Sequence, residues 1–301
     1  MMKLELRNIE KSFGEKNVLT GVSFQAESGK AFGLLGRNGA GKTTSIRILM
    51  KVFPADKGEI IVNGTPIDYK KIRIGYLPEE RGLYPKKGIL EQLVYFGELK
   101  GMGHKDAVKS VNYWLKRLEM TEYRNKKLDT LSKGNQQKIQ LIAALAHNPD
   151  IVILDEPFSG LDPVNAMLLK EVVKEEIGKG KIVLFSSHQM NYIEEFCDRI
   201  AILHQGRVAL QGDIFDIKRE YPRDCLVVRS QQAKRIMADL ASVCKKAEEG
   251  CLLIKLSDSE EKKKIMKYLI DNYDIDEVKV FEPSLNDIFV EYTKDGMREE
   301  E

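Results

Sequence analysis

The most chemically informative stretch of the chain is residues 36–44, which read Gly-Arg-Asn-Gly-Ala-Gly-Lys-Thr-Thr. Gly36, Gly41, Lys42 and Thr43 fill the G-x-x-x-x-G-K-[ST] pattern. An apolar run precedes this segment and a stretch with helical spacing follows it, which is the strand-loop-helix context that the pattern requires. The segment therefore predicts a phosphate-binding loop.

Each residue type in this loop suits the binding of a polyphosphate. Glycine lets the backbone turn tightly and aim its N–H groups inward, and the following helix adds its positive end. Lys42 is expected to reach the β- and γ-phosphates, and Thr43 to bind Mg²⁺. The residues expected to contact the nucleotide are Asn38, Gly39, Ala40, Gly41, Lys42, Thr43 and Thr44.

Carboxylates and an imidazole follow two further apolar runs. Residues 151–154 lead directly into Asp155 and Glu156, and residues 182–185 are followed after two serines by His188. Uninterrupted apolar runs suit central strands of a parallel sheet, in which ligands bind beyond the carboxyl ends of the strands. We expect Asp155 to reach Mg²⁺, Glu156 to orient or deprotonate a water, and His188 to lie at the same edge.

Length and composition restrict the class of protein. At 301 residues the chain has room for two domains, and its net charge of +2 does not favour nucleic acid as a partner. The 4 cysteines contain no C-x-x-C pair, which fits a reducing cytoplasm. The first residues are charged, unlike a signal peptide, and there is no run of about 18 apolar residues. We expect a cytoplasmic chain that does not itself span a membrane.

The hydrophobic pattern predicts an α/β core interrupted by helices. Strand patterns occur near residues 4–9, 22–24, 31–35, 58–64 and 72–78, and again near 151–154, 182–187, 200–203 and 207–210. Between about residues 83 and 147 the apolar spacing becomes helical. We therefore expect a first domain over residues 1–215, with a helical subdomain at about 83–147.

The pattern restarts in the tail, which we expect to form a second domain over residues 216–301. Strands are predicted at 225–229, 242–247, 251–256 and 277–281, with helices at 233–240 and 259–270. The order βαββαβ indicates a small ferredoxin-like unit. A last helix is expected after Ser284, with Leu285, Ile288, Phe289 and Tyr292 on one apolar face.

Taken in order, these segments resemble the ATP-binding subunits of ABC transporters over roughly residues 2–215. The motifs that carry the resemblance are the phosphate loop, residues 131–137, Asp155-Glu156, residues 159–162 and His188. The resemblance implies a P-loop NTPase fold with a RecA-like mixed sheet, ATP and Mg²⁺ as ligands, and ATP hydrolysis. It also implies a homodimer, or a heterodimer with a similar ATPase, arranged head to tail around two ATP. The partner is then a separate transmembrane permease on the inner face of the cell membrane, and no nucleic acid is expected.

The resemblance assigns roles to individual residues. Glu156 would be the catalytic carboxylate and His188 the γ-phosphate sensor, acting with Lys42. Asp162 would communicate between the two sites. Phe13 would stack on adenine, although from the residues alone it is equally suited to a hydrophobic core.

The signature segment departs from the usual LSGGQ at Lys133 and Asn135. Its serine and second glycine, Ser132 and Gly134, are retained, and the resemblance implies that they contact the nucleotide bound to the partner subunit. A helix that starts near Asn135 would point its positive end at the γ-phosphate, which ADP lacks.

Glu79 stands where the family usually has a glutamine that links Mg²⁺ and the attacking water to the membrane-facing helices. A carboxylate can accept a hydrogen bond from water or coordinate Mg²⁺ directly, so Glu79 joins Thr43 and Asp155 as an expected metal ligand. When ionised it adds negative charge near phosphate and cannot donate a hydrogen bond.

The segment Pro-Ser-Leu-Asn-Asp-Ile-Phe at residues 283–289 resembles the tail of ATPases paired with exporter-type permeases, among them the sodium-exporting type. The leading hypothesis is therefore an ATPase that drives a separate exporter, with Tyr84, Tyr95 and Phe96 as candidate permease contacts.

The alternatives to this hypothesis are a soluble ABC-type ATPase acting on a ribosome, nucleic acid or protein complex, an unrelated P-loop kinase or GTPase, and a nucleotide-binding regulator without turnover. The tail domain would be a dimer-stabilising unit, a regulatory ligand-binding unit, or an inert addition to the ATPase.

Overall fold

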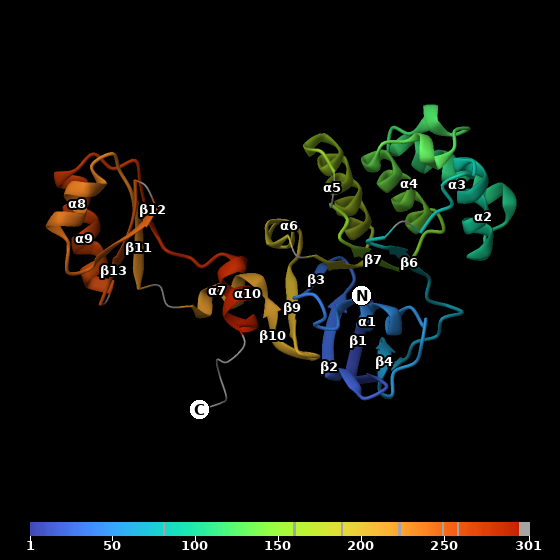
Figure 1. Cartoon of the computed structure of the whole chain (residues 1–301), viewed down its shortest axis with the longest axis horizontal. Coiled ribbons are helices and arrows are strands. Elements are labelled where there is room, and N and C mark those ends of the chain that lie inside the picture. The colour runs from blue at the N-terminus through green and yellow to red at the C-terminus, as the bar shows by residue number, and fades with distance from the viewer. Residues whose placement is uncertain are drawn as a thin grey trace. The chain divides into compact units, whose positions relative to one another are not determined.

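A six-stranded sheet organises the first part of the chain in the computed structural model (Figure 1). Its strand order is β10-β9-β3-β8-β7-β6, with β10 antiparallel to β9 and the other neighbours parallel. The bounds are β3 Ala31–Gly36, β6 Ile74–Leu77, β7 Ile151–Asp155, β8 Ile182–Ser186, β9 Arg199–His204 and β10 Arg207–Asp213. Every residue of β3, β7 and β8 is buried, because parallel strands of this kind are covered on both faces.

A second, antiparallel sheet has the order β2-β1-β4-β5. It consists of β1 Lys3–Phe13, β2 Lys16–Glu27, β4 Lys57–Val62 and β5 Thr65–Pro66, and α1 spans Lys42–Leu49. One hydrophobic core joins residues of both sheets to α1, including Leu4, Ile46, Leu49, Ile153 and Leu184. This core fixes α1, and with it the loop that precedes the helix.

The structure describes residues 1–80, 82–158, 161–187, 189–221, 224–248, 250–257 and 259–294. The chain divides into two units: residues 1–214 together with the chain from Phe289 on, and residues 215–288. The sequence led us to expect the second domain to continue to the end of the tail. In the structure, the second unit ends within the last helix. From Phe289 on, the chain belongs to the first unit, and Phe289 lines the cavity described below.

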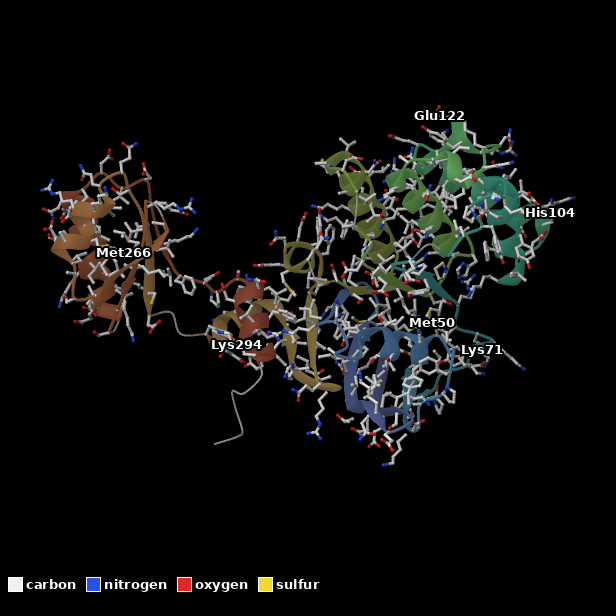
Figure 2. The ribbon with its side chains drawn as sticks, viewed as in Figure 1. Met50, Lys71, His104, Glu122, Met266 and Lys294 are labelled. Atoms are coloured by element: carbon white, nitrogen blue, oxygen red, sulfur yellow. The ribbon has the colours of Figure 1, made fainter. Side chains whose placement is uncertain are left out.

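Helices α2, α3 and α4 gather beside one another in the first unit and form its helical subdomain (Figure 1). They span Ile89–Leu99, His104–Arg117 and Lys133–Leu145, with short 3₁₀ turns η1 Thr121–Tyr123 and η2 Leu128–Thr130 between α3 and α4. Figure 2 labels His104 and Glu122 in this subdomain, and Met50 just after α1. Helices α5 Pro163–Gly178 and α6 Met190–Phe196 follow β7 and β8.

The second unit contains a four-stranded antiparallel sheet of order β12-β13-β11-β14. Its elements are β11 Cys225–Arg229, α8 Ala233–Asp239, β12 Cys244–Glu248, β13 Cys251–Lys255, α9 Ser259–Asn272 and β14 Glu277–Val280. This arrangement confirms the expected βαββαβ, ferredoxin-like unit. Two helices cross the division between the units along the chain, α7 Ile214–Glu220 and α10 Leu285–Thr293.

Gly75 of β6 tests how tightly the helical subdomain is packed on the sheet. A Cβ atom at this position would lie 2.1 Å from the carbonyl oxygen of Ala144 in α4 and 2.9 Å from Cγ of Pro149. We expect Gly75→Ala to lower the free energy of unfolding by about 1–3 kcal/mol, measured by urea denaturation, because backbone has to move. Gly178→Ala is the control, since a Cβ there meets nothing within 4 Å. Equal stability of the two variants would contradict this close packing.

Candidate active site

Loops from four parallel strands meet at the carboxyl edge of the six-stranded sheet. The phosphate loop follows β3, Glu79 follows β6, Glu156 follows β7 and Ser187 follows β8. A cavity of about 720 Å³ opens at this edge. It is lined by Lys16, Val18, Gly36, Arg37, Asn38, Gly39, Gly41, Lys42, Thr43, Thr44, Glu79, Asp155, Glu156 and Phe289, all of which belong to the first unit.

The phosphate loop reaches this cavity with little side-chain bulk in the way. Gly41 has φ +109°, a conformation that favours glycine, and a Cβ there would lie 2.4 Å from Cδ2 of Leu19. The helix α1 begins at the next residue, Lys42, so its amino-terminal end faces the loop. The hydroxyl of Ser45 donates to the carbonyl of Gly41 at 3.0 Å and holds this first turn.

Lys42 lies among carboxylates inside the cavity. Its ammonium donates to the carbonyl of Gly36 at 2.5 Å. Burial lowers the pKa of Lys42, while the negative charges of Glu156, Asp155 and Glu79 raise it. The lysine is thus a cation within electrostatic reach of three carboxylates, at the place where a polyphosphate and a hard metal ion would bring further charge.

Hydrogen bonds orient the two carboxylates that end β7. Asp155 and Glu156 are only 5% and 6% exposed. The Tyr76 hydroxyl donates to Oδ2 of Asp155 at 3.3 Å, and the Ser187 hydroxyl donates to Oε2 of Glu156 at 2.8 Å. The backbone of Glu156 has φ +49°, and its N–H donates to the carbonyl of Ser186 at 2.8 Å. Glu156 is therefore positioned by both its backbone and its side chain.

The signature segment and Asp162 lie together, but neither lines the cavity. Ser132 is the N-cap of α4, where its hydroxyl accepts from the N–H of Asn135 at 3.3 Å. Asp162 caps α5 by accepting from the N–H groups of Val164 and Asn165. A Cβ at Gly134 would lie 3.5 Å from a methyl carbon of Leu161, so the α4 amino-terminus is close to the start of α5.

The structure separates the expected site residues into groups. One cavity is lined by most of them, namely Asn38, Gly39, Gly41 to Thr44, Glu79, Asp155 and Glu156. Ala40, in the same loop, is buried. Phe13 does not line the cavity; it is 49% exposed and its ring packs edge-on against Phe53 at 5.4 Å between centroids. Ser159, Gly160 and His188 lie outside the described residues.

Several residues at the site were missed by the sequence reading. Lys16, Val18 and Phe289 line the cavity, and Tyr76 and Ser187 bind its carboxylates. Ser187 could have been suspected because it precedes His188 at the end of a predicted strand. Tyr76 and Phe289 carried no such signal, since aromatic residues in a strand and on an apolar helix face are common core residues.

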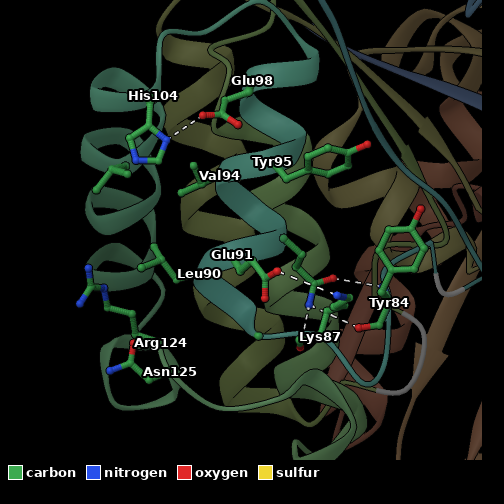
Figure 3. Close-up of a pocket in the computed structure, with 13 residues that line it drawn as sticks. Tyr84, Lys87, Leu90, Glu91, Val94, Tyr95, Glu98, His104, Arg124 and Asn125 are labelled. Atoms are coloured by element: carbon green, nitrogen blue, oxygen red, sulfur yellow. Dashed lines mark hydrogen bonds and ion pairs between the residues drawn. The ribbon is translucent and has the colours of Figure 1, made fainter.

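Two further hollows border the helical subdomain. One, of about 790 Å³, shares Thr43, Glu79 and Asp155 with the nucleotide cavity and extends to Phe96. The other, of about 820 Å³, lies along α2 and includes Tyr84, Tyr95 and the pair Glu98–His104, whose Oε1 and Nδ1 are 2.7 Å apart (Figure 3). The rings of Tyr84 and Phe96 stack at 6.1 Å, and Tyr84 and Tyr95 are exposed.

Comparison with known proteins decides which family this site represents. Residues 19–159 match the ABC transporter family, and residues 212–293 match the C-terminal domain of DrrA1-3-like ATP-binding proteins. An uncharacterized ABC transporter ATP-binding protein of Bacillus subtilis is 42% identical over 291 residues, which cover 96% of this chain and 97% of that protein. The chain belongs to the ATP-binding subunits of ABC transporters. As a member of this family, it binds and hydrolyses ATP.

This ABC ATPase is also similar to an export ATP-binding protein in sequence and to a dimeric cassette in structure. A Nod factor export ATP-binding protein of Burkholderia lata is 35% identical over 213 residues, covering 69% of this chain and 70% of that protein. A dimeric structure of a bacterial ABC transporter cassette has a TM-score of 0.63 and 25% identity, covering 70% of this chain and 98% of the cassette. Among the described residues of this ABC ATPase, no helix is both long and apolar enough to cross a bilayer.

The Tyr76–Asp155 hydrogen bond predicts a pH effect. Burial raises the pKa of Asp155, and the bond from Tyr76 lowers it by favouring the charged carboxylate. Burial raises the pKa of Tyr76, so the phenol keeps its proton and remains a donor. Glu156 and Lys42 also face Asp155, with opposite effects on its pKa.

We expect Tyr76→Phe to raise the pKa of Asp155, so that ATPase activity on acidification is half lost at a pH higher by about half a unit or more. The measurement is the ATPase rate of the purified protein against pH at half-saturating Mg²⁺. Tyr69→Phe is the matched control, because the Tyr69 hydroxyl donates to the carbonyl of Leu49 outside the cavity. An unchanged acid limb in Tyr76→Phe would contradict the assignment.

Proposed function

We propose that this protein is the ATP-hydrolysing subunit of an ABC exporter, that two such subunits enclose two ATP head to tail, and that the pair drives a separate transmembrane permease. One observation carries the dimeric part of the proposal. Ser132 and Gly134, at the positive end of α4, do not line the chain's own nucleotide cavity. A second subunit is therefore needed to bring a signature segment to each ATP.

The cavity has donors that suit Mg²⁺. The hydroxyl of Thr43 and the carboxylate of Asp155 are both at its wall, and Glu79 offers a third oxygen donor. Mg²⁺ prefers hard oxygen ligands and usually binds through one or two protein groups together with substrate phosphates. We propose that Thr43 and Asp155 hold the ion, which when bound supplies charge neutralisation for the β- and γ-phosphates.

Glu156 is the proposed general base for hydrolysis. It accepts a hydrogen bond from Ser187 at one carboxylate oxygen, so its side chain is held in one orientation at the cavity wall. A water oriented by Glu156 attacks the γ-phosphorus, and the bond from that phosphorus to the β,γ-bridging oxygen breaks. Glu156 takes the proton from the water, and Lys42 offsets the charge on the departing ADP.

Two findings support the exporter and dimer assignments. The relative from Burkholderia lata carries export in its name, and the similar bacterial cassette forms a dimer. Both cover more than two thirds of this chain. With an exporter as its partner, we also propose that the protein lies on the inner face of the cell membrane, bound through its permease.

The helical subdomain is the proposed permease contact. The hollow of about 790 Å³, which includes Glu79, joins this subdomain to the nucleotide cavity. A change at the γ-phosphate can therefore alter the surface that the subdomain offers to a partner. The exposed rings of Tyr84 and Tyr95 (Figure 3) supply apolar area of the kind that anchors protein interfaces. Both rings also pack with Phe96.

Glu156→Gln separates ATP binding from turnover. We expect this variant to bind ATP normally, to lose at least about 100-fold in ATPase rate, and to form a dimer that persists with MgATP. Light scattering after size-exclusion chromatography and phosphate release are the two measurements. Glu122→Gln, an exposed change in the helical subdomain, is the matched control. Near-normal turnover in Glu156→Gln would remove Glu156 as the base.

The permease assignment is tested with tagged Glu156→Gln protein in its native cells. Membranes are solubilised with MgATP, the protein is purified, and its companions are identified by mass spectrometry. We expect a multi-span membrane protein in stoichiometric amount, and its loss when Tyr84 and Tyr95 are both replaced by serine. Recovery with ribosomes or nucleic acid instead would favour a soluble ABC ATPase.

A further inference from the structure

The nucleotide cavity contains an aromatic side chain that comes from the far end of the chain. Among the described residues that line it, Phe289 of α10 is the one aromatic residue. It belongs to the first unit, as do Lys16 and Val18 of β2, which line the same cavity. Phe13 does not line the cavity, and its ring instead contacts Phe53 while the Lys11 ammonium lies 5.6 Å from its centroid.

The position of the phosphates indicates which part of ATP lies near Phe289. The phosphate loop, residues 36–44, is expected to bind phosphate through its backbone, and the carboxylates lie where the γ-phosphate end is expected. The lining residues that belong to neither group are Lys16, Val18 and Phe289. The nucleoside end of ATP therefore meets an apolar methyl-bearing side chain, a long cation and an aromatic ring.

The helix α10 presents Phe289 in a fixed manner. Leu285 and Ile288, on the apolar face of the helix, are completely buried. Thr293 is also completely buried, and its hydroxyl donates to the carbonyl of Phe289 at 2.7 Å. Phe289 itself is half-buried, so part of its side chain remains accessible at the cavity that it lines.

We propose that Phe289 is a base-contacting residue, which packs against the adenine of bound ATP on the side of Val18. An aromatic ring and a purine base attract each other through their faces, and the energy of one such stack corresponds to roughly a tenfold change in affinity. Binding of the nucleoside then depends on α10 as well as on the phosphate loop. The proposal rests on ATP binding and is independent of the permease.

The test compares ATP with tripolyphosphate, which has the phosphates but no base. Isothermal titration of the full chain is expected to show about tenfold weaker ATP binding for Phe289→Ala, with unchanged tripolyphosphate binding. Phe289→Tyr, which keeps a ring, is expected to bind ATP like the unmodified protein. Val290→Ala is the matched control, because Val290 follows Phe289 on α10, is exposed and does not line the cavity.

Each other outcome would overturn the proposal. Unchanged or tighter ATP binding in Phe289→Ala would make the ring a bystander or an obstruction. Equal losses for ATP and tripolyphosphate would assign it a purely structural role. If circular dichroism shows that Phe289→Ala is unfolded, Phe289→Leu keeps the volume without the ring, and normal ATP affinity in that variant would exclude base stacking. ATP binding by the unmodified protein checks the family activity separately.

Discussion

The site depends on one property of parallel sheets, namely that the carboxyl ends of neighbouring strands share an edge. The strands β6, β3, β7 and β8 end there. The segments that follow β6, β3 and β7 bring Glu79, Lys42 and Glu156 to one cavity, and Ser187 after β8 bonds Glu156, although these residues are far apart in the sequence. Of these strands, β3, β7 and β8 can be central because their residues are buried on both faces. The same apolar runs that stabilise the core therefore position the chemistry at its rim.

Electrostatics explains why the buried charges of this site tolerate one another. Glu156, Asp155 and Glu79 raise the pKa of Lys42, and Lys42 in turn lowers that of Asp155. Hydrogen bonds from Tyr76 and Ser187 replace water that the carboxylates lose on burial. The cavity is thus preorganised for a ligand that carries both phosphate and metal charge, and its carboxylates do not need to reorient when that ligand arrives.

The two ends of the nucleotide are met by different parts of the chain. The phosphate end meets a loop whose backbone geometry excludes most side chains, as the close approach of Gly41 to Leu19 illustrates. In our proposal, the base end meets Val18 of β2 and Phe289 of α10, which line the same cavity. The signature segment at Ser132 stands apart from this cavity, which is why the proposed function needs a second subunit.

The sequence by itself determined the phosphate loop, the Asp155-Glu156 pair, the helical insertion and the βαββαβ tail, because each depends on local spacing that a short window displays. Family resemblance added Ser132, Gly134 and Asp162, and it gave His188, which lies outside the described residues, the role of γ-phosphate sensor. Only the tertiary structure showed that Tyr76 bonds Asp155, that Phe13 packs on Phe53, and that Phe289 lines the cavity. These contacts join residues from different strands and helices, and an aromatic residue in a strand or on an apolar helix face has the same local pattern whether it fills a core or meets a ligand.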